Sequence, residues 1–128
     1  MNIHVRRNLP FVTVTLSNGG RTVVIPDVLL DTGSAGCVFK EEDVRQVGLL
    51  FDEATSFRTF RGIGGTERLW IQQVARIAVE SLEVRNIKVG ISVEDYGYGI
   101  RGILGMDFLL PARAVIDLDA MELRGSGT

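Results

Sequence analysis

The stretch from Val28 to Gly36 reads Val-Leu-Leu-Asp-Thr-Gly-Ser-Ala-Gly, so Asp31 stands at the end of an apolar run and before a tight turn. Thr32 and Gly33 can supply a hydroxyl and backbone N–H groups, and such donors hold a carboxylate ionised and fixed in place. A carboxylate held in this way can act as a general base when a second carboxylic acid lies beside it. The pattern therefore indicates acid–base chemistry at Asp31.

The second carboxylate is not close by in the chain. Asp27 is the nearest aspartate, and four residues along one extended strand separate it from Asp31 by about 13 Å at ~3.3 Å per residue. The two carboxylates cannot share a proton at that distance. A second copy of Asp31 from another subunit could share one with it.

The elements that must position Asp31 are predicted to be mostly strands. Short apolar runs rich in Val and Ile, among 15 glycines, favour strands over helices. A hairpin is expected from 11–16 and 21–30 around Ser17-Asn18-Gly19-Gly20, and a short helix over 40–47, ended by Gly48. Further strands are predicted at 38–39, 57–61, 66–72, 74–79, 84–93, 114–118 and 121–123, with an apolar strand passing into a short helix over 102–110. The chain is thus predicted to be all-β with one or two short helices, as one domain over 1–124 and a disordered, linker-like tail over 125–128.

Composition removes several classes of function. A chain of 128 residues with a net charge of −2 is long enough for one packed domain and lacks the basic character of a nucleic-acid-binding protein. One His and one Cys cannot supply the usual four ligands of a zinc site, so no metal is expected. Since no apolar stretch approaches the ~18 residues that span a bilayer, no membrane segment is expected in this chain. The sequence predicts a soluble, cytoplasmic protein, with a removed signal or anchor left open.

Two other motifs are weighed and set aside. Residues 97–102 match the Gly-x-Gly-x-x-Gly pattern of dinucleotide-binding proteins, but that motif needs a long helix, for which 102–111 leaves no room. His4, the single histidine, would serve a nucleophilic site only if it lay beside Ser34 or Cys37, and it is predicted to be a surface residue. Cys37 has apolar neighbours and is predicted to be a small core residue.

Three segments in order resemble the retropepsin-like family of single-domain aspartic proteases, of the soluble kind found in bacteria as well as in retroviruses. They are Val28–Phe39 with the helix that follows it, the hairpin around Gly62-Ile63-Gly64-Gly65, and Gly102–Leu109 followed by Ala114–Leu118. Together they cover most of the chain from residue 28 to 123. The resemblance implies a closed or partly open β-barrel with a glycine-tipped flap hairpin.

The resemblance also implies roles for individual residues. It places Asp31, Thr32 and Gly33 in the catalytic centre, with the Thr32 hydroxyl bonding across to the other half of a dimer. Ser34 is similar to the serine that hydrogen-bonds the catalytic carboxylate in pepsin-type lobes. Asp107 falls where the family has polar residues that brace the region beneath the active site, although a role in capping the short helix is equally open. The residues expected to contact substrate are Leu29, Ser34, Ala35, Gly62, Ile63, Gly64 and Ile103.

The predicted function is therefore that of an aspartic endopeptidase. Two carboxylates of a homodimer would activate a water molecule by general base and general acid catalysis on a peptide or protein substrate, with no metal or organic cofactor. The strands near 114–118 and 3–5 are candidates for the dimer contact. A catalytically weak peptide-binding or dimerisation module with the same fold stays open as the alternative.

Overall fold

The computed structural model describes residues 1–49, 56–62 and 65–126, and the side chains of residues 1–49 and 69–126. Strands dominate the described part of the chain, as the sequence predicts, and the helices are short. The elements are β1 (His4–Arg6), β2 (Leu9–Asn18), β3 (Arg21–Leu30), β4 (Val38–Lys40), α1 (Glu41–Val44), the 3₁₀ helix η1 (Arg45–Val47), β5 (Ser56–Gly62), β6 (Gly65–Val79), β7 (Leu82–Ser92), β8 (Gly102–Leu104), α2 (Met106–Leu109), β9 (Ala114–Asp117) and β10 (Glu122–Gly125).

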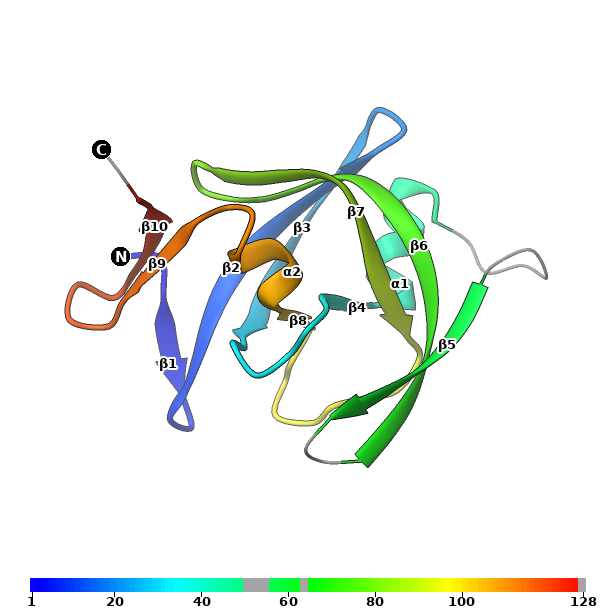
Figure 1. Cartoon of the computed structure of the whole chain (residues 1–128), viewed down its shortest axis with the longest axis horizontal. Coiled ribbons are helices and arrows are strands. Elements are labelled where there is room, and N and C mark those ends of the chain that lie inside the picture. The colour runs from blue at the N-terminus through cyan, green and yellow to red at the C-terminus, as the bar shows by residue number, and fades with distance from the viewer. Residues whose placement is uncertain (50–55, 63–64, 127–128) are drawn as a thin grey trace.

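Six of the strands close into a barrel (Figure 1). Neighbours are paired in the order β2-β3-β8-β4-β7-β6, and a further pairing of β6 with β2 completes the circle. Closure is possible because β2 uses one edge for β3 and divides the other between β1 and β6. The predicted all-β barrel with short helices is confirmed.

The β2–β3 hairpin forms at the predicted turn. Gly19 and Gly20 have φ angles of +57° and +79°, in the left-handed region that a tight hairpin turn requires and glycine adopts without strain. Beyond the turn, β3 alternates exposed and buried residues from Thr22 to Ile25, which directs one face into the barrel. The same strand then delivers Asp31 at its far end.

The predicted strands at 66–72 and 74–79 are in fact one strand, β6, and the predicted break between them is wrong. Gln73 looks like a polar interruption in the sequence, but in the structure it pairs with Lys88 of β7 inside a continuous ladder. The other edge of β6 changes partner along its length, from β5 up to Ile71 to β2 at Arg76–Ala78. A strand that serves two neighbours in turn must be long, and local patterning does not reveal that need.

The core is a single apolar cluster inside the barrel, closed at one side by the helices. Phe39 of β4 and Phe108 of α2 are fully buried. Val44 and Val47 bury the inner side of α1 and η1, and Gly48 ends this helical stretch with a φ of +83°. The predicted helix and its stop are confirmed, with a 3₁₀ last turn.

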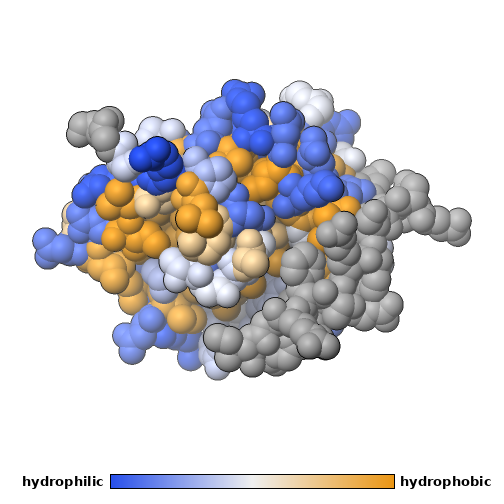
Figure 2. Space-filling model, in the orientation of Figure 1, coloured by the Kyte–Doolittle hydropathy of each residue, from blue (hydrophilic) through white to orange (hydrophobic). Residues whose placement is uncertain are grey.

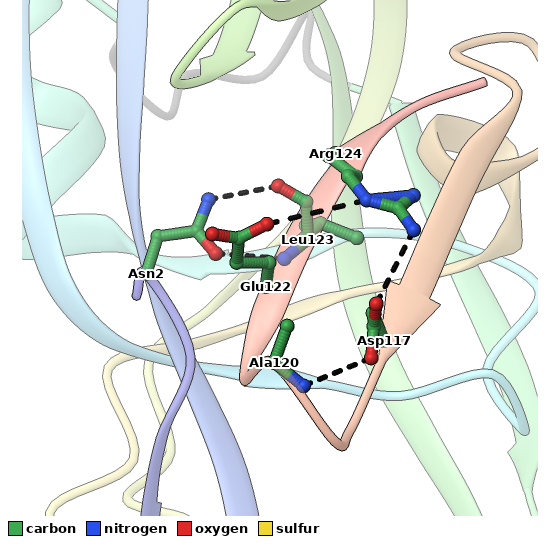
Figure 3. A network of polar contacts seen from close by, with 6 residues as sticks. All are labelled: Asn2, Asp117, Ala120, Glu122, Leu123 and Arg124. Carbon is green, nitrogen blue, oxygen red and sulfur yellow. Dashed lines mark hydrogen bonds and ion pairs between the residues drawn. The ribbon is translucent and has the colours of Figure 1, made fainter. Parts of the chain in front are cut away.

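The two ends of the described chain lie together. The Asn2 side chain donates to the carbonyl of Leu123 at 2.8 Å and accepts from its N–H at 2.7 Å, so one amide pairs with a residue of β10 (Figure 3). The Ile3 N–H donates to the Met121 carbonyl. Strand β10 extends to Gly125, which pairs with Ala114 of β9, and residues 127–128 lie outside the described part.

Candidate active site

Asp31 lies at the end of a parallel strand pair. Residues 28–30 of β3 run beside 102–104 of β8. The Asp31 N–H then donates to the Leu104 carbonyl at 3.1 Å, which extends the pairing by one residue. The buried Leu30 precedes Asp31, and the Asp31 side chain itself is half-buried. The barrel therefore presents this carboxylate at its surface on a fixed strand end.

A tight turn fixes the direction of the carboxylate. Asp31 Oδ1 accepts the Gly33 N–H at 2.9 Å, and the Asp31 carbonyl accepts the Ser34 N–H at 3.2 Å. A side chain on Gly33 would bring its Cβ within 3.2 Å of the same Oδ1, so glycine leaves the carboxylate open. Thr32 and Gly33 are exposed beside it.

Ser34 behaves differently from the expectation drawn from pepsin-type lobes. Its hydroxyl donates to the Gly36 carbonyl at 2.8 Å. Since a serine hydroxyl carries one proton, that proton is used inside the loop and does not reach the Asp31 carboxylate. The contact shapes the turn that leads from Ser34 toward β4.

The start of α2 is hydrogen-bonded to the loop that follows Asp31. Met106 N–H donates to the Ser34 carbonyl at 2.8 Å and Asp107 N–H to the Ala35 carbonyl at 3.2 Å. Gly105, the residue before the helix, sits so close that a Cβ would come within 2.6 Å of the Gly36 carbonyl oxygen. The backbone of α2 and the backbone of the loop are thus in direct contact.

Asp107 braces this region and does not cap the helix. The N-cap position is Gly105, and α2 has no side-chain capping bond. The Asp107 carboxylate instead accepts the N–H and the thiol of Cys37, at 3.2 and 3.0 Å. Cys37 is buried in the core, and burial, together with the nearby negative charge of Asp107, raises the pKa of its thiol well above the ordinary value.

The predicted substrate contacts fall in three places. Leu29 and Ile103 pair across the β3–β8 boundary and are both half-buried. Ala35 is exposed in the loop. Gly62 ends β5 opposite Gly65 of β6, whereas Ile63 and Gly64 lie outside the described residues. In Figure 1 the arrowhead of β5 and the loop from β3 to β4 both lie in the lower half of the view.

His4 and Asp27 form a cluster of their own. His4 Nε2 lies 3.1 Å from Asp27 Oδ1, and Arg6 Nη2 lies 3.5 Å from the same oxygen. The His4 ring stacks on Phe11, with 5.8 Å between ring centroids. The surface position predicted for His4 is confirmed by an exposed fraction of 51% for its side chain. The carboxylate of Asp27 is engaged with these two side chains.

One buried polar pair escaped the sequence analysis. Asp43 of α1 is only 2% exposed, and its carboxylate accepts two bonds from Arg101, at 2.5 Å from Nη2 and 3.3 Å from Nε. The hydrogen bonding of the Arg101 guanidinium to the Asp43 carboxylate raises the pKa of Arg101. The pair ties α1 to the segment that enters β8. Its signal in the sequence was an aspartate four positions before Val47, on the buried side of the predicted helix.

Within the described part of the chain, no group of three or more His, Cys, Asp or Glu side chains is arranged to hold a metal ion. Among the same residues, no helix has the length and apolar character needed to cross a bilayer.

Comparisons with known proteins found a matching family and a solved structure of similar fold. A family model described as aspartyl protease matches residues 12–108. A solved structure, a retropepsin-like aspartic protease from Rickettsia conorii, is similar in fold with a TM-score of 0.60 and 18% sequence identity, over 84% of this chain and 75% of that chain. No curated protein sequence matches the chain.

Proposed function

The chain belongs to the aspartyl protease family, and from that premise we propose that it is an endopeptidase whose catalytic dyad consists of Asp31 from two copies of the chain. The observation that carries the proposal is the geometry of Asp31. This carboxylate stands half-exposed at a fixed strand end, and a backbone N–H from Gly33 at 2.9 Å sets its direction. One such carboxylate per chain is half of the acid–base pair that the reaction needs.

The proposed reaction divides its work between two carboxylates about 3 Å apart, which share one proton because both cannot ionise easily at that distance. The ionised carboxylate takes a proton from a water molecule, and that water attacks the peptide carbonyl carbon. The protonated carboxylate donates to the carbonyl oxygen. Thr32 is proposed to bond across the dimer, and Gly33 to admit the substrate backbone.

The walls of the cleft are proposed on the same basis. Leu29 and Ile103 are half-buried neighbours next to Asp31, which suits the apolar side chains of a peptide. Ser34 and Ala35 would border the substrate from the loop. The turn at Gly62, Ile63 and Gly64 is proposed as the flap, which would exclude water when it closes.

The dimer contact is proposed at β9. This strand pairs with β10 on one edge, and its other edge has no partner strand in the described part of the chain. Hydrophobic residues gather over the end of the molecule that carries β9 and β10 (Figure 2), where Leu118 is 63% exposed. Ile3 is buried against its own chain, so β9 is the stronger of the two candidate segments. An unpaired apolar strand edge favours strand-to-strand association.

The test compares two aspartates of the same strand. Asp31→Asn removes the proposed base and is expected to lower hydrolysis of a diverse peptide library on the order of 10³-fold or more. Asp27→Asn, the matched control four residues earlier, is expected to retain wild-type turnover. Near-wild-type activity of a pure Asp31→Asn protein would overturn the proposal. A wild-type protein that binds peptides without cleaving them would establish the binding module instead.

A further inference from the structure

A row of side chains on one face of the sheet joins the first hairpin to the proposed substrate contacts. His4 of β1 pairs with Phe11 of β2, and Phe11 pairs with Leu29 of β3. Leu29 in turn pairs with Ile103 of β8. Directly paired residues of neighbouring strands project from the same face of a sheet. Leu29 and Ile103, which are proposed to contact substrate, therefore lie in line with the β1–β2 hairpin.

Two arginines extend from this hairpin to the loop between β7 and β8. The Arg6 guanidinium carbon lies 4.2 Å from the centroid of the Phe11 ring, and Arg6 Nη1 donates to the Tyr98 carbonyl at 2.5 Å. The Arg7 guanidinium carbon lies 4.9 Å from the centroid of the Tyr98 ring. Arg6 also lies 3.5 Å from the Asp27 carboxylate, but these side chains are 36 and 37% exposed, and an ion pair so exposed contributes little. Tyr98 is thus held at its carbonyl and at its ring.

The backbone of this loop is strained where the two arginines hold it. Gly97, Tyr98 and Gly99 have φ angles of +75°, +54° and +70°. Glycine adopts this left-handed conformation freely, but it costs free energy in a residue as bulky as tyrosine, which keeps it only where the surroundings impose it. Tyr98 is 60% exposed, so packing in the core does not impose it. The contacts with Arg6 and Arg7 therefore stabilise the conformation of Tyr98.

The end of the loop that enters β8 is fixed by other contacts. This loop, residues 93–101, is drawn in yellow in Figure 1. The Ile100 N–H donates to the Gly97 carbonyl at 3.0 Å, and Ile100 is 7% exposed. The Arg101 N–H donates to the Asp27 carbonyl at 2.9 Å. The barrel thus anchors residues 100–101, whereas residues 97–99 depend on the hairpin.

We propose that Arg6 and Arg7 are positioning residues for substrate binding, which act through Tyr98 to hold residues 97–99 as a fixed border of the cleft on the Ile103 side. The inference rests on the proposed function. Without the arginine contacts, residues 97–99 exchange among several arrangements, and the apparent affinity for substrate falls in proportion to the fraction that can bind. Once substrate is bound the loop is ordered, so the chemical step keeps its rate.

The first test is Arg6→Met, assayed with the peptide that the wild type cleaves fastest from a diverse library. Methionine keeps an unbranched side chain over Phe11 but cannot donate to the Tyr98 carbonyl. We expect KM to rise about tenfold with kcat changed by less than about twofold. Arg6→Lys, which keeps a cationic donor, should restore most of the loss. Arg85→Met, which breaks an exposed pair with Glu83, is the control and should change neither constant. An unchanged KM for Arg6→Met overturns the inference.

A second set of variants tests the contact between Arg7 and the Tyr98 ring. Tyr98→Phe keeps the ring beside the guanidinium and should leave KM unchanged, whereas Tyr98→Leu removes the ring and should raise KM about threefold. Arg7→Met should raise KM by a similar factor in the wild type and by none in Tyr98→Leu, because the two residues act as one unit. Effects that multiply in the double variant would overturn the role of Arg7. These variants also decide the question if Arg6→Met does not fold.

A third measurement needs no activity. Amide hydrogen exchange of Ile100, whose N–H is bonded to Gly97, should be about tenfold faster in Arg6→Met than in the wild type. The amide of Arg101, which is bonded to the barrel, should exchange at its original rate. Unchanged exchange at Ile100 overturns the inference even when KM rises. If the wild type cleaves no peptide but exchange at Ile100 increases as expected, the proposed function fails and the contact between the hairpin and the loop stands.

Discussion

At the scale of single residues, the site depends on carboxylates whose surroundings differ sharply. Asp31 is half-buried with one backbone donor, Asp43 is buried against a guanidinium, and Asp107 is bonded to a thiol. Each environment assigns a different role to the same functional group. Substitutions of their partners therefore have distinct and measurable effects.

Arg101 is expected to be essential for stability because it neutralises a buried charge. Arg101→Met leaves Asp43, which is 2% exposed, without its partner, and should lower the free energy of unfolding by about 3–5 kcal/mol. Urea denaturation measures the change. Arg124→Met, which breaks the more exposed pair with Asp117, is the control and should cost about 0–1 kcal/mol. The double variant Arg101→Met, Asp43→Leu should recover much of the loss, and a large loss in the Arg124 control would contradict this account.

The buried thiol should make stability fall at alkaline pH. The pKa of Cys37 is raised in the folded chain, so the folded thiol keeps its proton at a pH where the unfolded thiol has released it. The contribution of the Cys37 thiol to the free energy of unfolding is fully present below the ordinary thiol pKa of about 8.5. Above that pH the free energy of unfolding falls by up to about 1.4 kcal/mol per pH unit. Denaturation at pH 7 to 10 should show a steeper decline for the wild type than for Cys37→Ser. An equal decline of the free energy of unfolding with pH in the two proteins would contradict the raised pKa of Cys37.

At the scale of elements, the site is built by a short strand that lies between two others. The loop from Asp31 to Cys37 joins β3 to β4, and β8 fills the space between these strands, parallel to β3 and antiparallel to β4. The loop must therefore pass over the end of β8, where Gly105 leads into α2. Close backbone contact at this crossing fixes the path of the loop that carries the Asp31 carboxylate.

Gly105→Ala tests that crossing. The new Cβ would lie 2.6 Å from the Gly36 oxygen and 2.8 Å from the Ser34 oxygen, and both are backbone atoms that cannot rotate away. We expect a loss of about 1–3 kcal/mol in stability, together with a large loss of peptidase activity. Gly125→Ala is the control, because its Cβ would meet only the Leu82 side chain at 3.4 Å. Thermal unfolding compares the two variants. Equal melting temperatures would show that the loop yields without cost.

At the scale of the whole molecule, the chain completes its barrel by itself, and β9 has no partner strand on its outer edge among the described residues. Residues 2 and 3 bond to 123 and 121, which fixes the β9–β10 hairpin against the N-terminal segment. Arg124 and Asp117 link the two strands of the hairpin at 3.2 Å (Figure 3). The outer edge of β9 is then available to a second copy.

A shared dyad predicts a specific result when active and inactive chains are mixed. With equal amounts of wild type and Asp31→Asn at equilibrium, random pairing leaves about one quarter of the dimers with two intact carboxylates. The specific activity per total chain should therefore fall to about one quarter of the wild-type value, whereas independent monomers would retain one half. The specific activity of the mixture is measured directly after mixing and again after prolonged incubation, when the subunits have exchanged.

The proposed interface has its own test. Val115 lies on β9, and within the described part of the chain it does not pack against the apolar core, unlike Ile116 beside it. Val115→Lys should raise the dimer dissociation constant by about tenfold or more while the melting temperature of the monomer stays within a few degrees. Sedimentation at several protein concentrations measures the dimer dissociation constant. Dimerisation at wild-type strength would move the contact away from β9.

The sequence by itself determined the strand content, the β2–β3 turn and the family, because these depend on local chemistry: alternation, glycines at turn positions, and Asp-Thr-Gly after an apolar run. It also directed attention to Asp31 and Asp107. Only the tertiary structure decided that β6 is one strand, that the Ser34 proton goes to Gly36, and that Asp43 meets Arg101 and Asp107 meets Cys37. These facts join residues up to 70 positions apart or depend on which of several acceptors lies nearest. No local pattern fixes such a choice, because closure of the barrel brings those groups together.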